Sequence, residues 1–221
     1  MQTRFKAAWA ITAITLALGL WGYLSLDSTA QVPVHWNIEG EVDRTSSPLG
    51  ALLPVPLIQI FVIGIFSALR FIEPRKENLQ KSGKAITATA TAIAAFLGLV
   101  ELGLVLEAWG YDVMTGNYLL FVMGLLFAVL GNYLSKLRSG FFMGIRTPWT
   151  LSSDYVWNRT HRLGGRLFVI SGTMIAVIAL VTPSVIALQL MMGIVLVTAL
   201  VPVGYSWWLW RAEKKSAHEP D

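Results

Sequence analysis

Long apolar runs alternate with shorter polar segments along the whole chain. Six of these runs come close to the roughly 20 residues that a helix needs to cross a bilayer. They extend approximately over residues 7–26, 49–71, 85–106, 117–134, 163–182 and 185–210. The pattern predicts an all-α polytopic membrane protein with six transmembrane helices. We expect residues 1–221 to form a single integral membrane domain.

Two polar segments are longer than a simple turn between helices. Residues 27–48 follow the first run, and residues 135–163 separate the fourth run from the fifth. In the second segment, Ser152 or Ser153 can cap a short helix, with Asp154 in its first turn, where the helix dipole favours a carboxylate. The residues that would share one face of this helix are Val156, Thr160, Leu163 and Leu167. We therefore predict a short interfacial helix within the long loop.

Composition and charge indicate a membrane protein and a definite orientation. Hydrophobic residues make up 55% of the chain and charged residues 14%, whereas a soluble domain is about 25% charged. The net charge of +4 does not indicate nucleic acid, because 16 of the 17 Lys and Arg residues fall on the predicted side that holds both termini. Arg44 alone falls on the opposite side. The positive-inside rule therefore predicts cytoplasmic termini, a cytoplasmic loop at 135–163 and an extracytoplasmic loop at 27–48.

Catalytic and metal-binding motifs are missing from the sequence. It has no cysteine, which excludes disulfides, iron–sulfur clusters and thiolate metal sites, and only three histidines. It contains no His-Glu-x-x-His pair, no Gly-x-Ser-x-Gly elbow and no glycine-rich phosphate loop. We therefore expect no enzyme activity, no bound metal and no cofactor.

The predicted outer loop has the highest density of candidate binding groups. Between Val32 and Asn37, an extended chain would alternate apolar side chains with His35 and Asn37. His35 with the nearby carboxylates could also form a mixed nitrogen–oxygen cation site, although one histidine is a weak signal for zinc. The net negative charge of the loop would attract a cationic peptide over about 10 Å at 0.1 M salt. The candidate ligand-binding residues are His35, Trp36, Asn37, Glu39, Asp43 and, near the outer end of the third run, Glu101.

Glu101 is the one ionisable residue that we place inside a predicted span. An ionisable group in a membrane helix is costly and is therefore a functional hypothesis by default. The alternative is a structural role, in which Glu101 pairs with a neighbouring helix or with water. The glycines of the third, fourth and fifth spans are instead expected to permit close helix packing.

Residues 144–151 predict a rigid turn in the long loop. Gly144 permits unusual backbone angles, Pro148 fixes its own φ, and Thr147 is driven out of the helical region by the proline that follows. Arg146 could lock this turn through hydrogen bonds to carbonyls or could bind a lipid phosphate, and we favour the lock. Trp149 is either an interfacial anchor or a donor within the fold.

The same region closely resembles the signature of the SdpI family of bacterial membrane immunity proteins. The resemblance rests on the run GIRTPWTLSSDYVWNRTHR, preceded by Gly-Asn-Tyr at 131–133, and on VPVHWNIEGEVDR at 32–44, which is similar to the family's extracytoplasmic segment. The sequence departs from the family pattern at one place. Members usually carry an Asn just before a pair of aromatic residues, whereas here Ser139-Gly140 precede the pair Phe141-Phe142. The residues that carry the cytoplasmic signature are Asn132, Gly144, Arg146, Thr147, Pro148, Trp149, Trp157, His161 and Arg162.

The resemblance implies a function at the bacterial cytoplasmic membrane. A protein of this kind would bind or neutralise a secreted antimicrobial peptide toxin, and its partners would be membrane lipids and that peptide. The resemblance also implies a relay, in which a cytoplasmic transcriptional repressor is sequestered at the membrane, so that the chain itself contacts no nucleic acid. The alternative function is a small membrane transporter or exporter of a peptide or lipid. The scarcity of charged groups in the spans and the lack of a nucleotide site argue against it.

Overall fold

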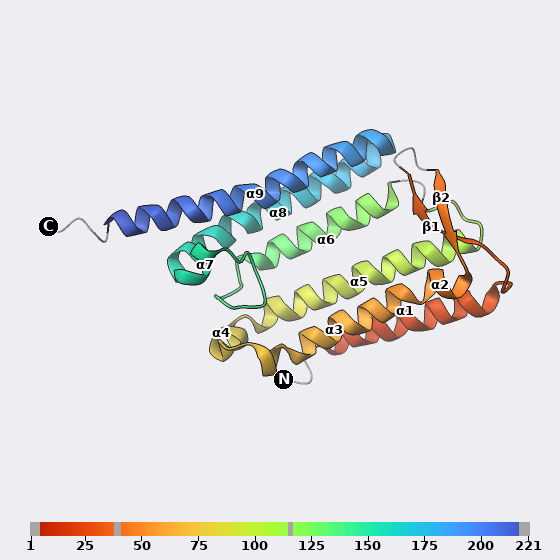
Figure 1. The fold of residues 1–221 in the computed structure, drawn as a ribbon, viewed down its shortest axis with the longest axis horizontal. Helices are drawn as coiled ribbons and strands as arrows, with labels where there is room; N and C mark the ends of the chain where they lie inside the picture. The colour runs from red at the N-terminus through yellow and green to blue at the C-terminus, as the bar shows by residue number, and fades with distance from the viewer. Residues whose placement is uncertain (1–4, 38–40, 115–116, 217–221) are drawn as a thin grey trace.

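The computed structural model describes residues 5–37, 41–114 and 117–216, and helices dominate it (Figure 1). The long helices lie side by side along the longest axis of the molecule. The helices are α1 (Lys6–Ser25), α2 (Pro48–Leu52), α3 (Pro54–Ile72), α4 (Lys76–Lys81), α5 (Gly83–Ala108), α6 (Tyr118–Leu134), α7 (Pro148–Ser152), α8 (Asp154–Val181) and α9 (Ser184–Ser216). The strands are β1 (Val32–Trp36) and β2 (Val42–Ser46).

Several helices have the length and composition of membrane spans. Within the described residues, five helical segments qualify, namely Lys6–Ser25, Pro48–Ile72, Gly83–Ala108, Asp154–Val181 and Ser184–Ser216. The apolar helix α6 is shorter, with 17 residues, which is at the lower limit for crossing a bilayer. The prediction of a helical, multi-pass membrane protein is confirmed.

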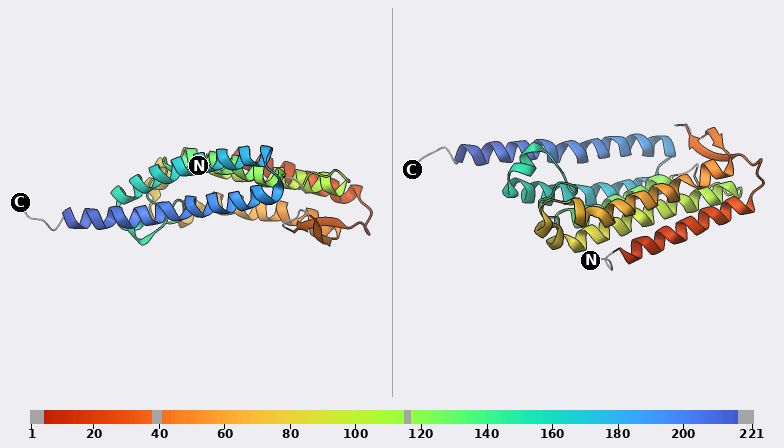
Figure 2. Two further views of the ribbon diagram at one scale, coloured as in Figure 1. Left: turned by 90° about the horizontal axis from the view of Figure 1, so that it is seen from above. Right: turned by 60° about the horizontal axis from the view of Figure 1, so that its bottom comes forward.

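The helices pack as two groups that meet between α5 and α6. The first group contains α1, α3 and α5, and the second contains α6, α8 and α9. The short helices α4 and α7 lie at one end of the bundle, and the strands lie at the other (Figure 1). Figure 2 shows that α9 extends beyond the other helices at the α7 end. We call these the loop end (α4, α7 and residues 135–153) and the hairpin end (β1, β2 and α2).

Glycines permit the close approach of α6 and α8. A Cβ at Gly131 would lie 2.5 Å from the Val169 nitrogen and 2.7 Å from the Gly165 carbonyl oxygen. About two turns earlier in α6, a Cβ at Gly124 would lie 2.6 Å from the Ala176 nitrogen. Because backbone rather than side chain blocks these positions, only glycine allows the two helices to pack at this distance. The predicted packing role of these glycines is confirmed.

The predicted outer loop folds into a hairpin rather than remaining a simple extended connection. Strands β1 and β2 pair antiparallel, with Val32 opposite Ser46 and Trp36 opposite Val42. The alternation along residues 32–37 indicated a strand, but the all-α prediction did not include its partner. Val32 is buried at the end of the bundle among α2 and α5, where Leu52 and Val105 complete an apolar cluster. The hairpin therefore covers the ends of those helices.

The prediction of a separate short interfacial helix after Ser153 is wrong. Ser153 does cap a helix, since its hydroxyl accepts from the Val156 nitrogen, and Asp154 lies in the first turn. That helix, however, is α8, which continues without interruption to Val181. The glycines at 164 and 165 do not break it, because α6 and Ile145 pack directly against them. The short helix of the loop is α7, one turn earlier than predicted.

Candidate functional site

The turn at the loop end has the backbone geometry that its sequence predicts. Gly144 adopts φ +106°, which side chains disfavour. Thr147 is extended, with φ −111° and ψ 160°, as expected before Pro148. A capping box forms the N-terminus of α7. The Thr147 hydroxyl accepts from the Thr150 nitrogen at 3.1 Å, and the Thr150 hydroxyl accepts from the Thr147 nitrogen at 2.9 Å.

Thr150 and Thr147 also tie α7 to the rest of the structure. The fully buried Thr150 hydroxyl donates to the Ile145 carbonyl at 2.8 Å. The Thr147 hydroxyl lies 3.0 Å from that of Ser206, on α9. The turn, α7 and α9 are thus joined by buried hydroxyl groups, and each such bond contributes on the order of 1 kcal/mol.

His161 and Trp157 hold the inner side of the turn from α8. His161 Nε2 accepts from the Ile145 nitrogen at 2.9 Å, and Nδ1 lies 2.8 Å from the Trp157 carbonyl. Since Nε2 accepts, the ring is neutral with its proton on Nδ1. The two rings stack at 3.9 Å, and the Trp157 indole donates to the Leu137 carbonyl at 2.9 Å. A side chain at Gly144 would collide with both rings.

Glu73, between α3 and α4, is a residue that sequence reasoning missed. It is only 3% exposed. Its Oε2 accepts from the backbone nitrogens of Phe141 and Phe142, at 3.0 and 3.2 Å, and its Oε1 accepts from that of Arg75 at 3.0 Å. Glu73 therefore fixes the paired aromatics, and Gly140 leaves room for the carboxylate. The only sequence signal was an acidic residue in a connection that is mostly basic.

Helix α4 adds further bonds to the long loop. Asn78 Nδ2 donates to both the carbonyl and the hydroxyl of Ser139, at 2.9 and 3.0 Å. Arg75 donates to the Leu151 carbonyl at 3.2 Å and lies over the Phe141 ring. The Ser139 that departs from the usual family pattern thus has a partner of its own.

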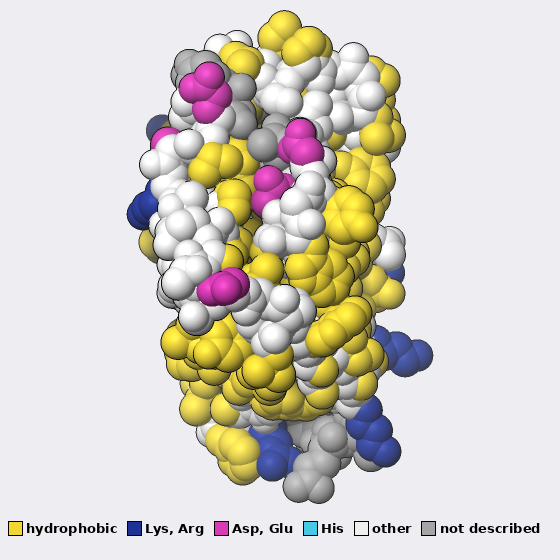
Figure 3. Space-filling model, turned by 90° about the vertical axis from the view of Figure 1, so that its right-hand side faces the viewer, with side chains coloured by type: hydrophobic (Ala, Val, Ile, Leu, Met, Phe, Trp, Pro, Cys, Tyr) yellow, Lys and Arg dark blue, Asp and Glu magenta, His cyan; other side chains and the backbone are white. Residues whose placement is uncertain are grey.

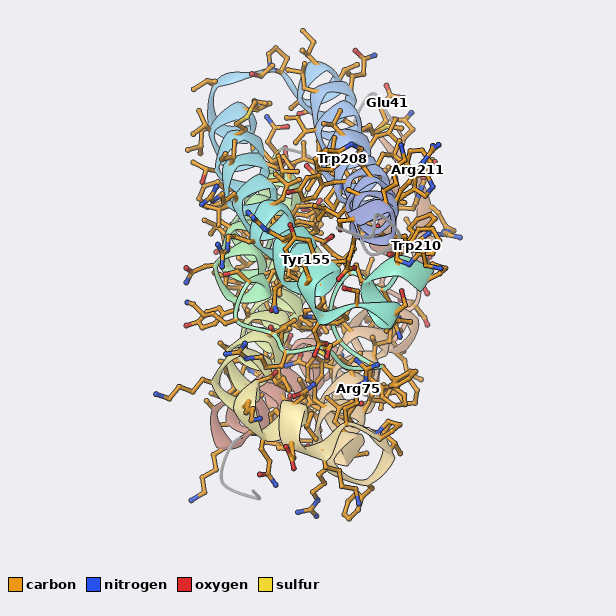
Figure 4. All side chains as sticks on the ribbon, turned by 90° about the vertical axis from the view of Figure 1, so that its left-hand side faces the viewer. Glu41, Arg75, Tyr155, Trp208, Trp210 and Arg211 are labelled. Carbon is orange, nitrogen blue, oxygen red and sulfur yellow. The ribbon has the colours of Figure 1, made fainter. Side chains whose placement is uncertain are left out.

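Arg146 and Trp149 contribute in different ways. Arg146 is exposed, and its Nη1 donates to the Phe141 carbonyl at 2.6 Å, which is the kind of directed contact that the lock hypothesis requires. Trp149 is half-buried and lines an open groove of about 660 Å³ between α7 and the end of α9. Figure 4 looks onto this end and shows Trp210 beside α7.

Two of the predicted signature residues do not join this network in the described structure. Asn132 and Arg162 are both exposed, on α6 and α8 respectively. The structure therefore brings together Gly144, Arg146 and the signature residues 147, 148, 157 and 161, with Trp149 in the adjacent groove. The side chains of Asn132 and Arg162 lie apart from them.

The hairpin end carries exposed acidic groups on a small sheet. His35 Nδ1 lies 2.6 Å from Asp43 Oδ1 across the two strands, and both side chains are about half exposed. Asn37 pairs with Glu41, through its Oδ1 and the Glu41 nitrogen at 2.8 Å. Glu39 lies outside the described residues. Figure 3 shows acidic side chains scattered over this face, among apolar and uncharged ones.

Glu101 is not part of the hairpin surface with which it was grouped. It is fully buried in α5 and faces Gly19 of α1 and the carbonyl of Leu52. Trp36, in contrast, packs partly buried against the apolar cluster that includes Val32, Leu52 and Val105. Within the described ranges, no group of three or more His, Asp or Glu residues could hold a metal ion.

The chain is similar in sequence to known proteins. Residues 136–206 match the model of the SdpI/YfhL protein family. The predicted resemblance to SdpI is confirmed. The chain is also 23% identical over 166 residues to the immunity protein SdpI of Bacillus subtilis (strain 168), an alignment that covers 75% of this chain and 77% of that protein. No solved structure matches the chain.

The SdpI/YfhL match and a second match fall on different parts of the fold. The SdpI/YfhL match runs from the long loop through α7 and α8 into α9. Residues 10–60 match a domain of unknown function, DUF1648. That segment includes most of α1, the hairpin, α2 and the start of α3. The hairpin end and the loop end are thus each part of a recurring sequence unit.

Proposed function

We propose that this chain is an immunity protein of the bacterial cytoplasmic membrane, which neutralises a secreted antimicrobial peptide toxin. The observation that carries the proposal is the similarity to the immunity protein SdpI over three quarters of the chain. The apolar helices, long enough to cross a membrane, agree with such a membrane protein. Membrane lipids and the peptide would be its partners.

The proposed topology has six spans, with α6 as the fourth and with α2 and α3 together as the second. Both termini and the signature loop at 135–163 would be cytoplasmic, and the loop at 27–48 would be extracytoplasmic. The 16-to-1 distribution of Lys and Arg supports this orientation. The hairpin and the long loop lie at opposite ends of the bundle, as the topology requires (Figure 1).

In this proposal, the toxin contacts the hairpin end. His35, Trp36, Asn37 and Asp43 present imidazole, indole, amide and carboxylate groups on or beside one small sheet. Such groups suit a cationic, partly apolar peptide. Peptide binding would favour one arrangement of the bundle, and a cytoplasmic repressor would respond at the loop end through the groove beside Trp149.

The test is protection of living cells. A bacterial strain sensitive to secreted peptide toxins would express the protein, and its survival would be compared with that of a strain carrying the empty vector. We expect survival to rise for at least one toxin of a cationic panel. Equal survival across the panel, with the protein present in the membrane, would reject an immunity function.

A further inference from the structure

Glu101 occupies a setting that the immunity proposal does not use. It lies in α5, about two turns from the end of the helix, and none of its surface is exposed. Both of its carboxyl oxygens are buried without a hydrogen-bond partner among the described residues. A buried carboxylate with no donor is strongly disfavoured, most of all within an apolar helix. The structure must therefore supply a compensating ligand.

The neighbour of Glu101 is another acceptor. A Cβ built on Gly19 would lie 2.6 Å from Glu101 Oε1 and 2.7 Å from the Leu52 carbonyl oxygen, so both oxygens face the same point on α1. In a continuous helix, the Leu52 carbonyl would accept from the nitrogen of residue 56. That residue is Pro56, which has no N–H, and the helix is interrupted at Leu53 between α2 and α3. The carboxyl group and this carbonyl thus both lie beside Gly19, at a helix break.

No basic side chain is placed to neutralise Glu101. The elements packed against α5 are α1, α2, α3, α4, α6 and β1. Their charged residues lie at helix ends or on the surface, and the titratable groups on these elements and on α5 are Lys6, Tyr23, His35, Arg70, Lys76, Glu77, Lys81, Lys84, Glu107, Tyr118 and Tyr133. Of the nearest, Glu107 accepts from Val113 and Met114, and Tyr118 donates to the Leu99 carbonyl.

We propose that Glu101 and the Leu52 carbonyl form a buried binding site for a single proton. With the proton, the carboxyl group becomes a donor toward the carbonyl oxygen, and two opposed acceptors become one hydrogen bond. A metal ion is the poorer ligand, because Mg²⁺ and Ca²⁺ take about six to eight oxygens. The same bond joins α5 to the interrupted helix beside Gly19, so the bound proton stabilises the helix contacts beneath the hairpin.

Infrared spectroscopy of the protein in lipid bilayers detects this proton directly. At pH 7 exposed Asp and Glu side chains are ionised, and Glu73 is a carboxylate bound by three N–H donors. We expect one band from a protonated carboxylic acid in the native protein. Glu101→Gln keeps a donor for the Leu52 carbonyl and should lose the band without losing the fold. Glu107→Gln, on the same helix, is the matched control and should retain it.

Each infrared outcome supports or overturns the proton site, whether or not the protein confers immunity. A band that is present in the native protein and in E107Q but absent from E101Q supports the proton site. Absence of the band from the native protein at pH 7 overturns the proton site, and this measurement needs no variant. A band that is present in K⁺ and lost in Na⁺ also overturns it, because the site would then exchange its ligand for a metal cation.

Discussion

The two ends of the molecule are held together by different kinds of interaction. At the loop end, buried Glu73, Thr150 and His161 each bond to the backbone of the long loop. At the hairpin end, the His35–Asp43 pair is half exposed and runs across the hairpin itself, while Val32 attaches the sheet through apolar contact. Directed, buried bonds fix a single conformation, whereas apolar contact permits small displacements.

The difference indicates a division of roles between the ends. A segment with few buried directed bonds opens at lower free energy than a fully bonded one, so the hairpin end suits recognition of a varied ligand. The loop end, in contrast, suits a scaffold that changes only between discrete arrangements. The following predictions test whether the ends differ in location, in rigidity and in function.

The largest effect concerns location, because the account places the two ends on opposite sides of the membrane. A reporter enzyme that is active only outside the cytoplasm should be active when fused after Ser46 or Gly110. It should be inactive when fused after Gln80, after Thr150 or at the C-terminus. Activity at Thr150 would contradict the six-span topology.

A second prediction removes the central carboxylate of the loop end. Glu73→Ala removes the acceptor of three partly buried backbone nitrogens, and each such loss costs on the order of 1 kcal/mol. We expect a sharp drop in the amount of folded protein and in its unfolding temperature in detergent. Glu77→Ala is the control, because Glu77 is exposed and makes only a 3.8 Å surface pair with Lys81. Equal behaviour of the two variants would show that the loop is not held in this way.

A third prediction compares one glycine from each end. Gly144 and Gly110 both have positive φ, at +106° and +88°. A Cβ at Gly144 would collide with the His161 and Trp157 rings, whereas nothing lies within 4 Å of one at Gly110. Gly110→Ala should therefore show only backbone strain, about 1–3 kcal/mol, and Gly144→Ala should be clearly less stable. Thermal unfolding of both variants measures the difference, and similar values would argue against a tighter loop end.

Much of the fold was accessible from the sequence because hydropathy determines it. The first apolar run, residues 7–26, coincides with α1 (Lys6–Ser25) to within one residue at each end. The length of α8 was not accessible, because residues 154–162 are mostly polar, and their continuity with the apolar run that follows is seen only in the assembled structure. The hairpin was missed for a similar reason, since pairing depends on a partner strand that alternation alone does not identify.

The candidate site was accessible in part. The turn at Gly144 and Pro148 was predicted from backbone chemistry, which is local. Glu73 was not predicted, because its partners are 68 and 69 residues away in the chain and nothing in the local sequence links them. Long-range hydrogen bonds of this kind emerge only when the helices are assembled.

The central claim is that the hairpin end recognises the toxin, and survival of cells that express hairpin variants tests it most directly. Asp43→Ala breaks the pair with His35 on the exposed sheet and should make cells about tenfold more sensitive, the change expected from a loss of about 1.4 kcal/mol in binding free energy. Asp112→Ala removes another exposed acidic residue from the chain and should protect as well as the native protein. Full protection by Asp43→Ala and by His35→Ala, at native protein levels in the membrane, would contradict the account.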